Sequence, residues 1–314
     1  MAIPKNVFLG LIYKFPFTGI TALRLCVLTS KNVRLYALAH PRNLFCLPKQ
    51  ERFFVVWHAW LWYNQIDKSG FVEVKMRITV VNGTEKRGVT YHLKEIFLDQ
   101  FREDAEITEF YLPRDCPNFC AGCTVCFLKD EHLCKDAEYV QKIEKAMLAA
   151  DLLVFASPAY VFHATGAMKT MLDHFGYRWM PHRPAKEMFG KRAVIITQCL
   201  GAGGKSASKD IRDSLSWWGI SKIKACSFKL MSEVVWDKIP EKKKTEMSER
   251  LVRIAKQTCK FDFTRPARTG FITKMKFYMV RMLQKNLGKQ DPEYTDYRYW
   301  NHNGWTDAQR PWKQ

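Results

Sequence analysis

The chain has 314 residues, 47% of them hydrophobic, and this length and composition fit one full globular core with appendages and exclude wholesale disorder. Its net charge of +19 favours anionic partners, namely phosphorylated cofactors, nucleic acids or anionic membrane surfaces. The sequence has no helix-turn-helix, RNA-recognition or zinc-finger spacing, so we expect no nucleic-acid partner.

Ten cysteines are many for a chain without a secretory signature, and half of them lie between Cys116 and Cys134. A secreted disulfide scaffold would spread its cysteines along the chain. The clustering favours a reducing compartment, and we therefore expect a cytoplasmic protein with metal or thiol chemistry. Residues 7–29 resemble a membrane segment only weakly, because Lys14 and Pro16 interrupt the apolar run.

The chain divides into three regions. Residues 1–75 mix apolar patches with Lys, Pro and Arg and follow neither a helix period nor a strand period, so we interpret them as an irregular extension that is disordered or not native. Because Met76 opens a regular globular pattern, our hypothesis is that it is the natural first residue. Residues 76–262 form the predicted core domain, and residues 263–314 form a basic, aromatic tail.

From Met76 onward, β-branched runs alternate with amphipathic segments, which predicts alternating strands and helices. In chain order, the expected elements are a strand at 77–82, a helix at 90–101, a strand at 107–112, a helix at 137–149, a strand at 152–157, a helix at 164–175, a strand at 193–199, a helix at 206–217, a strand at 222–228 and a helix at 241–260.

Two of the expected strands, 152–156 and 193–197, are apolar throughout instead of alternating. Such strands are buried on both faces, which indicates a parallel sheet between two layers of helices. With right-handed crossovers, the sequence predicts a doubly wound, three-layer α/β fold with five parallel strands.

The tail contains a basic apolar stretch from Ile272 to Lys285 that predicts a helix. Five apolar side chains recur on one face of it, namely Ile272, Met275, Met279, Met282 and Leu283. We interpret the stretch as a helix that packs on the core or on a dimer partner. A helix that lies on a membrane surface is the alternative.

The first expected strand ends in a loop, residues 82–90, that is suited to an anion. Gly83 and Gly88 permit a close backbone approach, Thr84 and Thr90 supply hydroxyls, and Lys86 supplies charge. The N–H groups at the start of the following helix also favour an anion. The loop has neither the G-x-G-x-x-G nor the G-x-x-x-x-G-K pattern, so it indicates neither a dinucleotide fold nor an NTPase.

Two further loops leave the third and fourth expected strands. The first contains Ser157, Pro158 and Tyr160, whose ring can cover a planar ligand. The second runs from Thr197 past Gly201, and its glycines let the backbone lie close to a ligand. Because ligands bind at the carboxyl ends of parallel strands, the three loops together predict one binding site.

Four cysteines follow at tight spacing, as Cys120-x2-Cys123-x2-Cys126-x7-Cys134. Four thiolates at such spacing can each bind one iron of a [4Fe–4S] cluster. The last gap is longer than in the ferredoxin pattern, and zinc sites more often use two separated C-x2-C pairs. A cluster, a zinc ion and free thiols therefore all stay open.

Residues 76–228 resemble the NADPH-dependent FMN reductase family of the flavodoxin-like superfamily. Residues 82–90 are similar to its phosphate loop, with Glu85 in place of the usual Pro and Val89 in place of the usual Asn. Residues 157–160 are similar to its Ser-Pro-x-Tyr flavin loop, and Cys120-Ala-Gly-Cys123-Thr-Val-Cys126 to the cysteine motif of its iron–sulfur flavoprotein branch.

The resemblance implies roles for individual residues. Thr84, Lys86, Gly88 and Thr90 would hold the phosphate of FMN. Ser157, Pro158 and Tyr160 would contact its isoalloxazine ring. The four clustered cysteines would hold a [4Fe–4S] cluster.

The function that we expect is an FMN-dependent NAD(P)H oxidoreductase that passes electrons from a pyridine nucleotide through FMN to a quinone, a flavin or another acceptor. The alternative is an iron–sulfur and FMN electron carrier without its own NAD(P)H activity. We expect a small-molecule acceptor or a redox protein as partner. We also expect a homodimer, because flavin sites of this superfamily are often completed by a second subunit.

Overall fold

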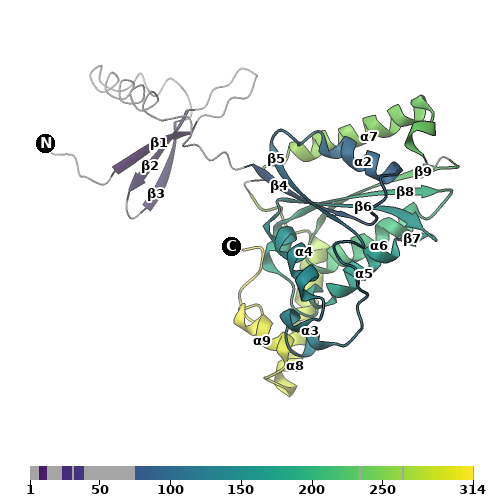
Figure 1. Cartoon of the computed structure of the whole chain (residues 1–314). Helices are drawn as coiled ribbons and strands as arrows, with labels where there is room; N and C mark the ends of the chain where they lie inside the picture. The colour runs from purple at the N-terminus through teal and green to yellow at the C-terminus, as the bar shows by residue number, and fades with distance from the viewer. Residues whose placement is uncertain are drawn as a thin grey trace, which may run out of the picture. The chain divides into compact units, whose positions relative to one another are not determined.

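The computed structural model describes the strands at 7–12, 23–29 and 32–38, and residues 75–232, 235–263 and 265–313 (Figure 1). The chain forms two units, residues 1–74 and residues 75–314.

The first unit contains an antiparallel sheet of β1 (Val7–Ile12), β2 (Leu23–Thr29) and β3 (Asn32–Leu38), with β2 in the middle. The sequence pattern did not predict these strands. The other residues of this unit lie outside the described part of the chain. The three-region division and Met76 as the natural first residue stay predictions.

The second unit is built on a twisted parallel sheet with the strand order β5-β4-β6-β8-β9. This is the 2-1-3-4-5 order of flavodoxin-like folds, so the predicted doubly wound sheet of five parallel strands is confirmed. A sixth, two-residue strand pairs antiparallel with β6. The strands are β4 (Met76–Asn82), β5 (Ala105–Tyr111), β6 (Leu152–Tyr160), β7 (His163–Ala164), β8 (Arg192–Leu200) and β9 (Lys222–Leu230).

Helices cover both faces of this sheet (Figure 1). On one face lie α2 (Val89–Leu98) and α7 (Glu241–Cys259), and on the other lie α4 (Ala137–Ala149), α5 (Gly166–His174) and α6 (Gly204–Trp217). As a consequence, neighbouring residues of β4 face two different cores. Val80 belongs to the core under α2 and α7, while Val81 belongs to the core under the other three helices. Such strands have no polar face, which explains their continuous apolar pattern.

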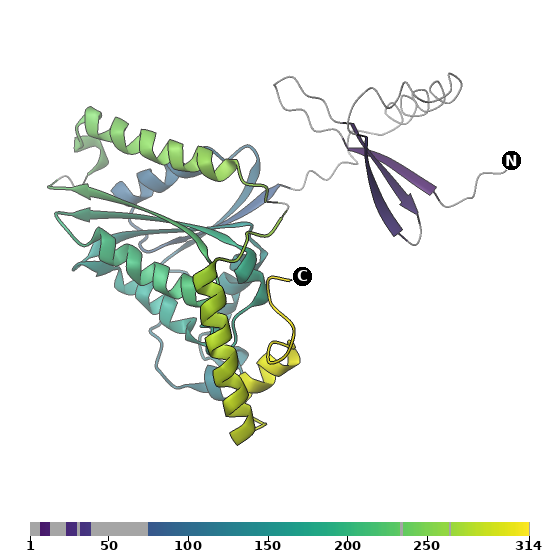
Figure 2. The ribbon, with the colours of Figure 1, turned by 180° about the vertical axis from the view of Figure 1, so that it is seen from behind.

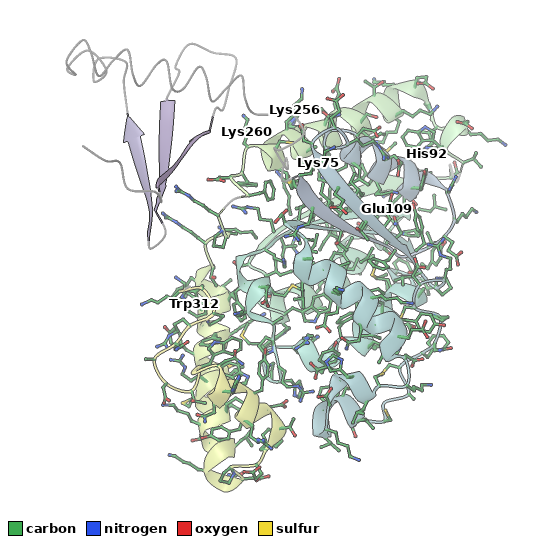
Figure 3. The ribbon with its side chains drawn as sticks, turned by 60° about the vertical axis from the view of Figure 1, so that its left-hand side comes forward. Lys75, His92, Glu109, Lys256, Lys260 and Trp312 are labelled. Atoms are coloured by element: carbon green, nitrogen blue, oxygen red, sulfur yellow. The ribbon has the colours of Figure 1, made fainter. Side chains whose placement is uncertain are left out.

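The tail forms α8 (Phe271–Gln290) and α9 (Thr295–His302), as its helical pattern predicted for α8. These helices build a third, aromatic core with the segment between α5 and β8, and Trp312 lies beside α8 (Figures 2 and 3). The buried members are Met180, Phe189, Phe277, Val280, Trp300 and Trp305. The tail is therefore an integral part of the second unit.

Short helical turns complete the second unit. α3 (Val125–Leu128) lies within the cysteine loop. Single 3₁₀ turns occur at Glu131–Leu133, Gly176–Arg178, Lys186–Gly190 and Trp236–Lys238.

Candidate functional site

The three predicted loops meet in one pocket at the carboxyl ends of β4, β6 and β8. Its volume is about 360 Å³, within the range of small-molecule sites. The lining residues are Thr84, Lys86, Gly88, Val89, Thr90, Pro158, Ala159, Tyr160, Val161, Phe162, Gln198, Leu200 and Ala202. Six of the ten predicted cofactor residues are among them, namely Thr84, Lys86, Gly88, Thr90, Pro158 and Tyr160.

The first wall of the pocket is suited to an anion. Helix α2 begins after Gly88 without a side-chain cap, and its first turn has no acidic residue. Gly88, Val89 and Thr90 line the pocket, so the positive end of the helix dipole and the first N–H groups of the helix, those of Val89 and Thr90, face it. Lys86 adds a full positive charge beside them.

Glu85, the acidic residue of this loop, is exposed and does not line the pocket. Its charge acts on Arg114 instead. The pKa of Arg114 is raised chiefly by its hydrogen bond with Asp115 and to a smaller extent by Glu85. The fold thus turns the unfavourable carboxylate away from the anion-binding wall.

A buried ion pair lies beneath the first wall. Lys94 is fully buried, and its Nζ lies 2.6 Å from Glu109 Oε2 and 2.5 Å from Glu95 Oε1. Asn82, the last residue of β4, donates from Nδ2 to the same Glu109 oxygen at 3.1 Å. Burial opposes charge on Glu109, but the bonds from Lys94, Asn82 and Tyr111 outweigh it and lower the pKa of this carboxyl. The network fixes the end of β4, and the sequence analysis did not find it.

Gly83 and Ser157 lie behind the pocket wall and join two loops. Ser157 is fully buried, and its Oγ donates to the Pro158 carbonyl and accepts from Thr165 N–H at 3.3 Å. Thr165 Oγ1 donates to the Gly83 carbonyl at 2.6 Å. A Cβ on Gly83 would come within 2.7 Å of Ser157 Oγ, so this position has room only for glycine. Both residues position the loops that line the pocket.

The second wall is a β-hairpin that the sequence did not predict. Tyr160 of β6 pairs with His163 of β7, which leaves Val161 and Phe162 as a two-residue turn. Both have positive φ, +48° and +67°, the pattern of a type I′ turn. Such turns normally contain Asn and Gly, and a β-branched residue there is strained.

The hairpin is held against the rest of the site from two sides. Asp210 of α6 accepts from Ala164 N–H at 2.9 Å and pairs with His163 Nδ1 at 3.1 Å. On the other side, the Phe162 backbone lies so close to Gly203 that a Cβ there would approach Phe162 Cα to 2.7 Å. These contacts fix a largely exposed aromatic rim, with Phe162 62% and Tyr160 50% exposed.

The third wall, at the end of β8, is lined by other residues than the sequence predicted. Thr197 is fully buried behind the wall, where its Oγ1 donates to the Gly204 carbonyl at 3.1 Å. Gly201 has a φ of +69° and does not line the pocket either. Instead Gln198, Leu200 and Ala202 line it. Gln198, the next residue of β8, points to the opposite side of the sheet from Thr197 and lines the pocket although it is only 8% exposed.

The cysteine loop gathers four free thiols. Cys120 and Cys123 are exposed, whereas Cys126 and Cys134 are half-buried. Burial raises the pKa of Cys126, and negative charge on Cys134, Cys120 and Cys123 would raise it further. The same holds for Cys134, whose pKa is raised by burial and by its charged neighbours, including Asp136. The four predicted metal ligands thus differ in burial within one loop.

Two further residues lie close to Cys134. Among residues 75–232, 235–263 and 265–313, only Cys134, Asp136 and His174 bring three metal-binding atoms of His, Cys, Asp or Glu within 4.8 Å of one another. His174 Nε2 already lies 2.9 Å from the Asn118 carbonyl oxygen. In this part of the chain, the four predicted cysteines are thus farther apart than the ligands of one tetrahedral zinc ion.

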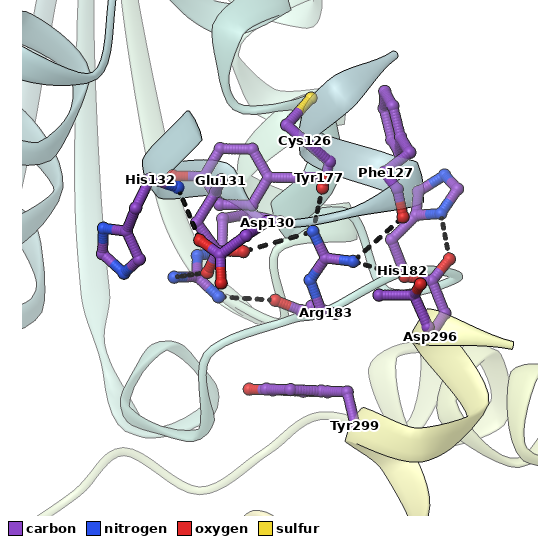
Figure 4. Close-up of polar contacts among 12 residues, drawn as sticks. Cys126, Phe127, Asp130, Glu131, His132, Tyr177, His182, Arg183, Asp296 and Tyr299 are labelled. Atoms are coloured by element: carbon purple, nitrogen blue, oxygen red, sulfur yellow. Dashed lines mark hydrogen bonds and ion pairs between the residues drawn. The ribbon is translucent and has the colours of Figure 1, made fainter. Parts of the chain in front are cut away.

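A buried arginine ties the cysteine loop to the tail (Figure 4). Arg183 donates to the carbonyls of Cys126 and Phe127 and, at 3.0 Å, to Asp296 Oδ1 of α9. It also forms an ion pair with Glu131 at 3.2 Å. Asp296 is only 1% exposed, so this charge pair is shielded from water. The tail therefore holds the backbone next to a predicted metal ligand.

The fold defines a flavodoxin-like α/β protein with a pocket at the carboxyl ends of its parallel strands. The sequence model of the family described as NADPH-dependent FMN reductase matches residues 76–232, half of the chain. The chain belongs to this family of oxidoreductases.

Individual relatives are distant. An iron-sulfur flavoprotein of Methanocaldococcus jannaschii is 24% identical over 187 residues, 58% of this chain and 93% of the relative. One from Archaeoglobus fulgidus is 26% identical over 37% of this chain and half of the relative's length. An FMN-dependent NADH:quinone oxidoreductase of Pseudomonas putida is 33% identical over 24% of this chain and 43% of its own.

Solved structures of two other proteins match about 60% of this chain. A Bacillus anthracis azoreductase covers 59% of this chain and 100% of its own, with a TM-score of 0.46 and 15% identity. An NADH:FMN oxidoreductase covers 62% of this chain and 95% of its own, with a TM-score of 0.43 and 17% identity.

Proposed function

We propose that this protein is an FMN-dependent NAD(P)H oxidoreductase that passes electrons to a quinone, a flavin or another acceptor. The observation that carries the proposal is the convergence of three strand-end loops on one pocket. That pocket combines an anion-binding helix start with an aromatic rim. Family membership supports the same cofactor.

The lining residues fit a phosphorylated flavin. Thr84, Lys86 and the N–H groups of Val89 and Thr90 would bind the phosphate beside Gly88, because they supply donors and positive charge and no carboxylate is among the lining residues. Pro158 and Tyr160 would flank the ring from the hairpin, and Gln198 would approach it from β8. Bound FMN supplies the hydride and electron chemistry, and this chain supplies its position and access.

We also propose that Cys120, Cys123, Cys126 and Cys134 hold a [4Fe–4S] cluster. Four thiolates of one loop can each bind a different iron of such a cluster. The similarity to iron-sulfur flavoproteins supports it. This observation favours the second candidate function, an electron carrier without its own NAD(P)H activity.

One experiment separates the two functions. The full chain, purified without oxygen, is supplied with FMN and then mixed with NADPH or NADH and a quinone. Steady oxidation of either nucleotide supports the oxidoreductase. A protein that binds FMN and accepts electrons from a chemical reductant but not from NAD(P)H is the carrier instead. A protein that does not bind FMN contradicts both proposals, and iron and sulfide analysis tests the cluster separately.

The exposed rim of the pocket supports the expected homodimer. Val161 is 90% exposed at the tip of the hairpin beside Phe162, and a second subunit would cover both. Sedimentation equilibrium of wild type and Val161→Asp tests this. A dimer that the variant weakens is the expected result, and a monomeric wild type contradicts it.

A further inference from the structure

Helix α8 presents a continuous apolar stripe to solvent. The exposed side chains recur every one, three or four residues, so they lie along one side of the helix. They are Phe271, Ile272, Met275, Tyr278, Met279, Met282 and Leu283, each 45–80% exposed. In the view of Figure 2, the helix (yellow-green) lies in front, with no other element of the second unit over it.

Residues on the opposite side of α8 attach the helix to the second unit. Phe277 and Val280 are buried in the aromatic core. Gln284 Nε2 donates to the Pro181 carbonyl at 2.6 Å, and Arg281 Nη2 donates to the Gln309 carbonyl at 2.7 Å. Within the stripe, Tyr278 also contacts the second unit, since its hydroxyl accepts from Arg310 Nε at 2.9 Å and its ring lies against Trp312. The other exposed side chains of the stripe form an apolar patch that is available to a partner.

The charges of α8 indicate what that partner is. The helix contains no Asp or Glu and five basic residues, Lys274, Lys276, Arg281, Lys285 and Lys289. Lys285 and Lys289 are exposed along one edge of the stripe. An apolar stripe with basic borders matches an anionic lipid surface, where apolar side chains enter the interface and lysines meet the head groups.

Two other arrangements of this helix are unfavourable. Two copies packed stripe to stripe would bring the exposed Lys285 and Lys289 of both helices into one interface, with no carboxylate on either helix. Spanning a bilayer is excluded for α8, since no helix in the described part of the chain is long and apolar enough. The remaining arrangement is one in which the axis of α8 lies parallel to a membrane surface.

We propose that the outer face of α8 is a docking surface for anionic phospholipid bilayers. The stripe would lie in the head-group region with α8 parallel to the membrane plane, and Lys285 and Lys289 would contact lipid phosphate or carboxylate groups. The predicted cytoplasmic location would place this face opposite an anionic leaflet. This proposal does not depend on the proposed redox function.

Vesicle sedimentation with the full chain tests the proposal. One set of vesicles contains phosphatidylcholine alone, and the other contains phosphatidylcholine with phosphatidylserine. We expect sedimentation with the anionic vesicles only, and weaker binding at high salt because salt screens the lysines. Failure to bind anionic vesicles at low salt overturns the proposal.

Two matched variants separate α8 from the general positive charge of the chain. Lys285→Glu with Lys289→Glu should lower the partition coefficient by about tenfold or more, because each lysine contributes appreciably to surface attraction. Lys242→Glu with Lys256→Glu changes the charge equally on α7, where both lysines are exposed (Figure 3 shows Lys256). The α7 pair should have a clearly smaller effect. Equal effects of the two pairs overturn the proposal.

A third variant tests the apolar stripe. Met275→Gln, Met279→Gln and Met282→Gln together should weaken binding about tenfold and leave the circular dichroism spectrum and melting temperature unchanged, since all three side chains are exposed. Unchanged vesicle binding would assign the interaction to another segment. If the wild type is a dimer that Met279→Glu dissociates, the stripe is an interface between copies, and the lipid proposal is wrong.

Discussion

At the scale of single residues, Lys86 is the only cation among the described residues that line the pocket. Lys86→Ala should weaken FMN binding about tenfold, because a charge-assisted phosphate contact is lost. Its neighbour Arg87 is exposed outside the lining, so Arg87→Ala should change affinity about twofold at most. Quenching of flavin fluorescence measures both. Riboflavin, which lacks the phosphate, should bind both variants alike, and an equal loss for riboflavin would contradict the assignment of Lys86.

Gly203 and Gly201 form a natural pair for comparison. Both have positive φ, but only a Cβ at Gly203 would collide with backbone, at 2.7 Å from Phe162 Cα. Gly201→Ala should lower the free energy of unfolding by about 1 kcal/mol through backbone strain alone. Gly203→Ala should lower it by about 2–4 kcal/mol, because the clash adds to the strain. Urea unfolding of both variants measures the difference, and equal losses would show that the hairpin does not rest on Gly203.

The ion pair of Glu109 makes the stability of the second unit depend on pH in the acid range. Its pKa in the folded protein lies below the ordinary value of 4.5, so its stabilisation is fully present above that pH and is lost as the pH falls through the lowered pKa. Glu109→Gln should lower the free energy of unfolding near neutral pH by about 2 kcal/mol, allowing for the solvated part of the carboxyl. Below pH 4.5 the difference between wild type and variant should shrink. A difference that stays constant with pH contradicts the ion pair with Lys94.

At the scale of elements, the β6–β7 hairpin is strained by its own sequence. Replacing Val161 with Asn and Phe162 with Gly should raise the free energy of unfolding by about 1–2 kcal/mol, because these residues tolerate the positive φ of the turn. The same change removes the Phe162 ring from the exposed rim of the pocket, so FMN should dissociate faster. Thermal melting and stopped-flow fluorescence measure the two effects. A lower melting temperature would show that the turn is not strained.

Sequence patterns predicted the regular helices but not the β6–β7 hairpin. Helix α4 was predicted at 137–149 as it occurs, because its apolar residues keep one helical face inward. Strand β6 was predicted to end at Ser157 but continues to Tyr160. The turn that allows this continuation contains Val161 and Phe162, which carry no turn signature. Tertiary contacts from Asp210 and Gly203 hold it, and these contacts lie far away in the sequence.

The sequence predicted which three loops form the pocket, but not which of their residues line it. Glycines and hydroxyl residues at strand ends marked all three loops, and six of the predicted residues line the pocket. The pattern could not show which loop residues face inward. Ser157 and Thr197 have the polar groups that a ligand needs, but they use them for backbone carbonyls within the core. Lys94 was missed because a lysine on a helix is normally solvated.

At the scale of the whole molecule, the cysteine loop depends on the tail. Asp296 accepts hydrogen bonds from Arg183 and pairs with His182, and Asp296→Ala would leave the buried arginine partly unpaired. We expect a loss of about 3 kcal/mol in the free energy of unfolding. Trypsin should also cut faster at Lys129, within the cysteine loop. The exposed Asp307→Ala serves as control and should change neither. An intact loop in the Asp296 variant would contradict this dependence.

The Arg183–Asp296 pair also determines when the cysteine loop can be fixed during synthesis of the chain. Asp296 follows its partner by 113 residues, so the ribosome releases the cysteines long before the residue that helps to fix them. During that interval the nascent loop is open to solvent and to any iron-delivering machinery. Once α9 has docked, the backbone at Cys126 is locked. Loading of the proposed cluster should therefore be easiest before translation of the tail is complete.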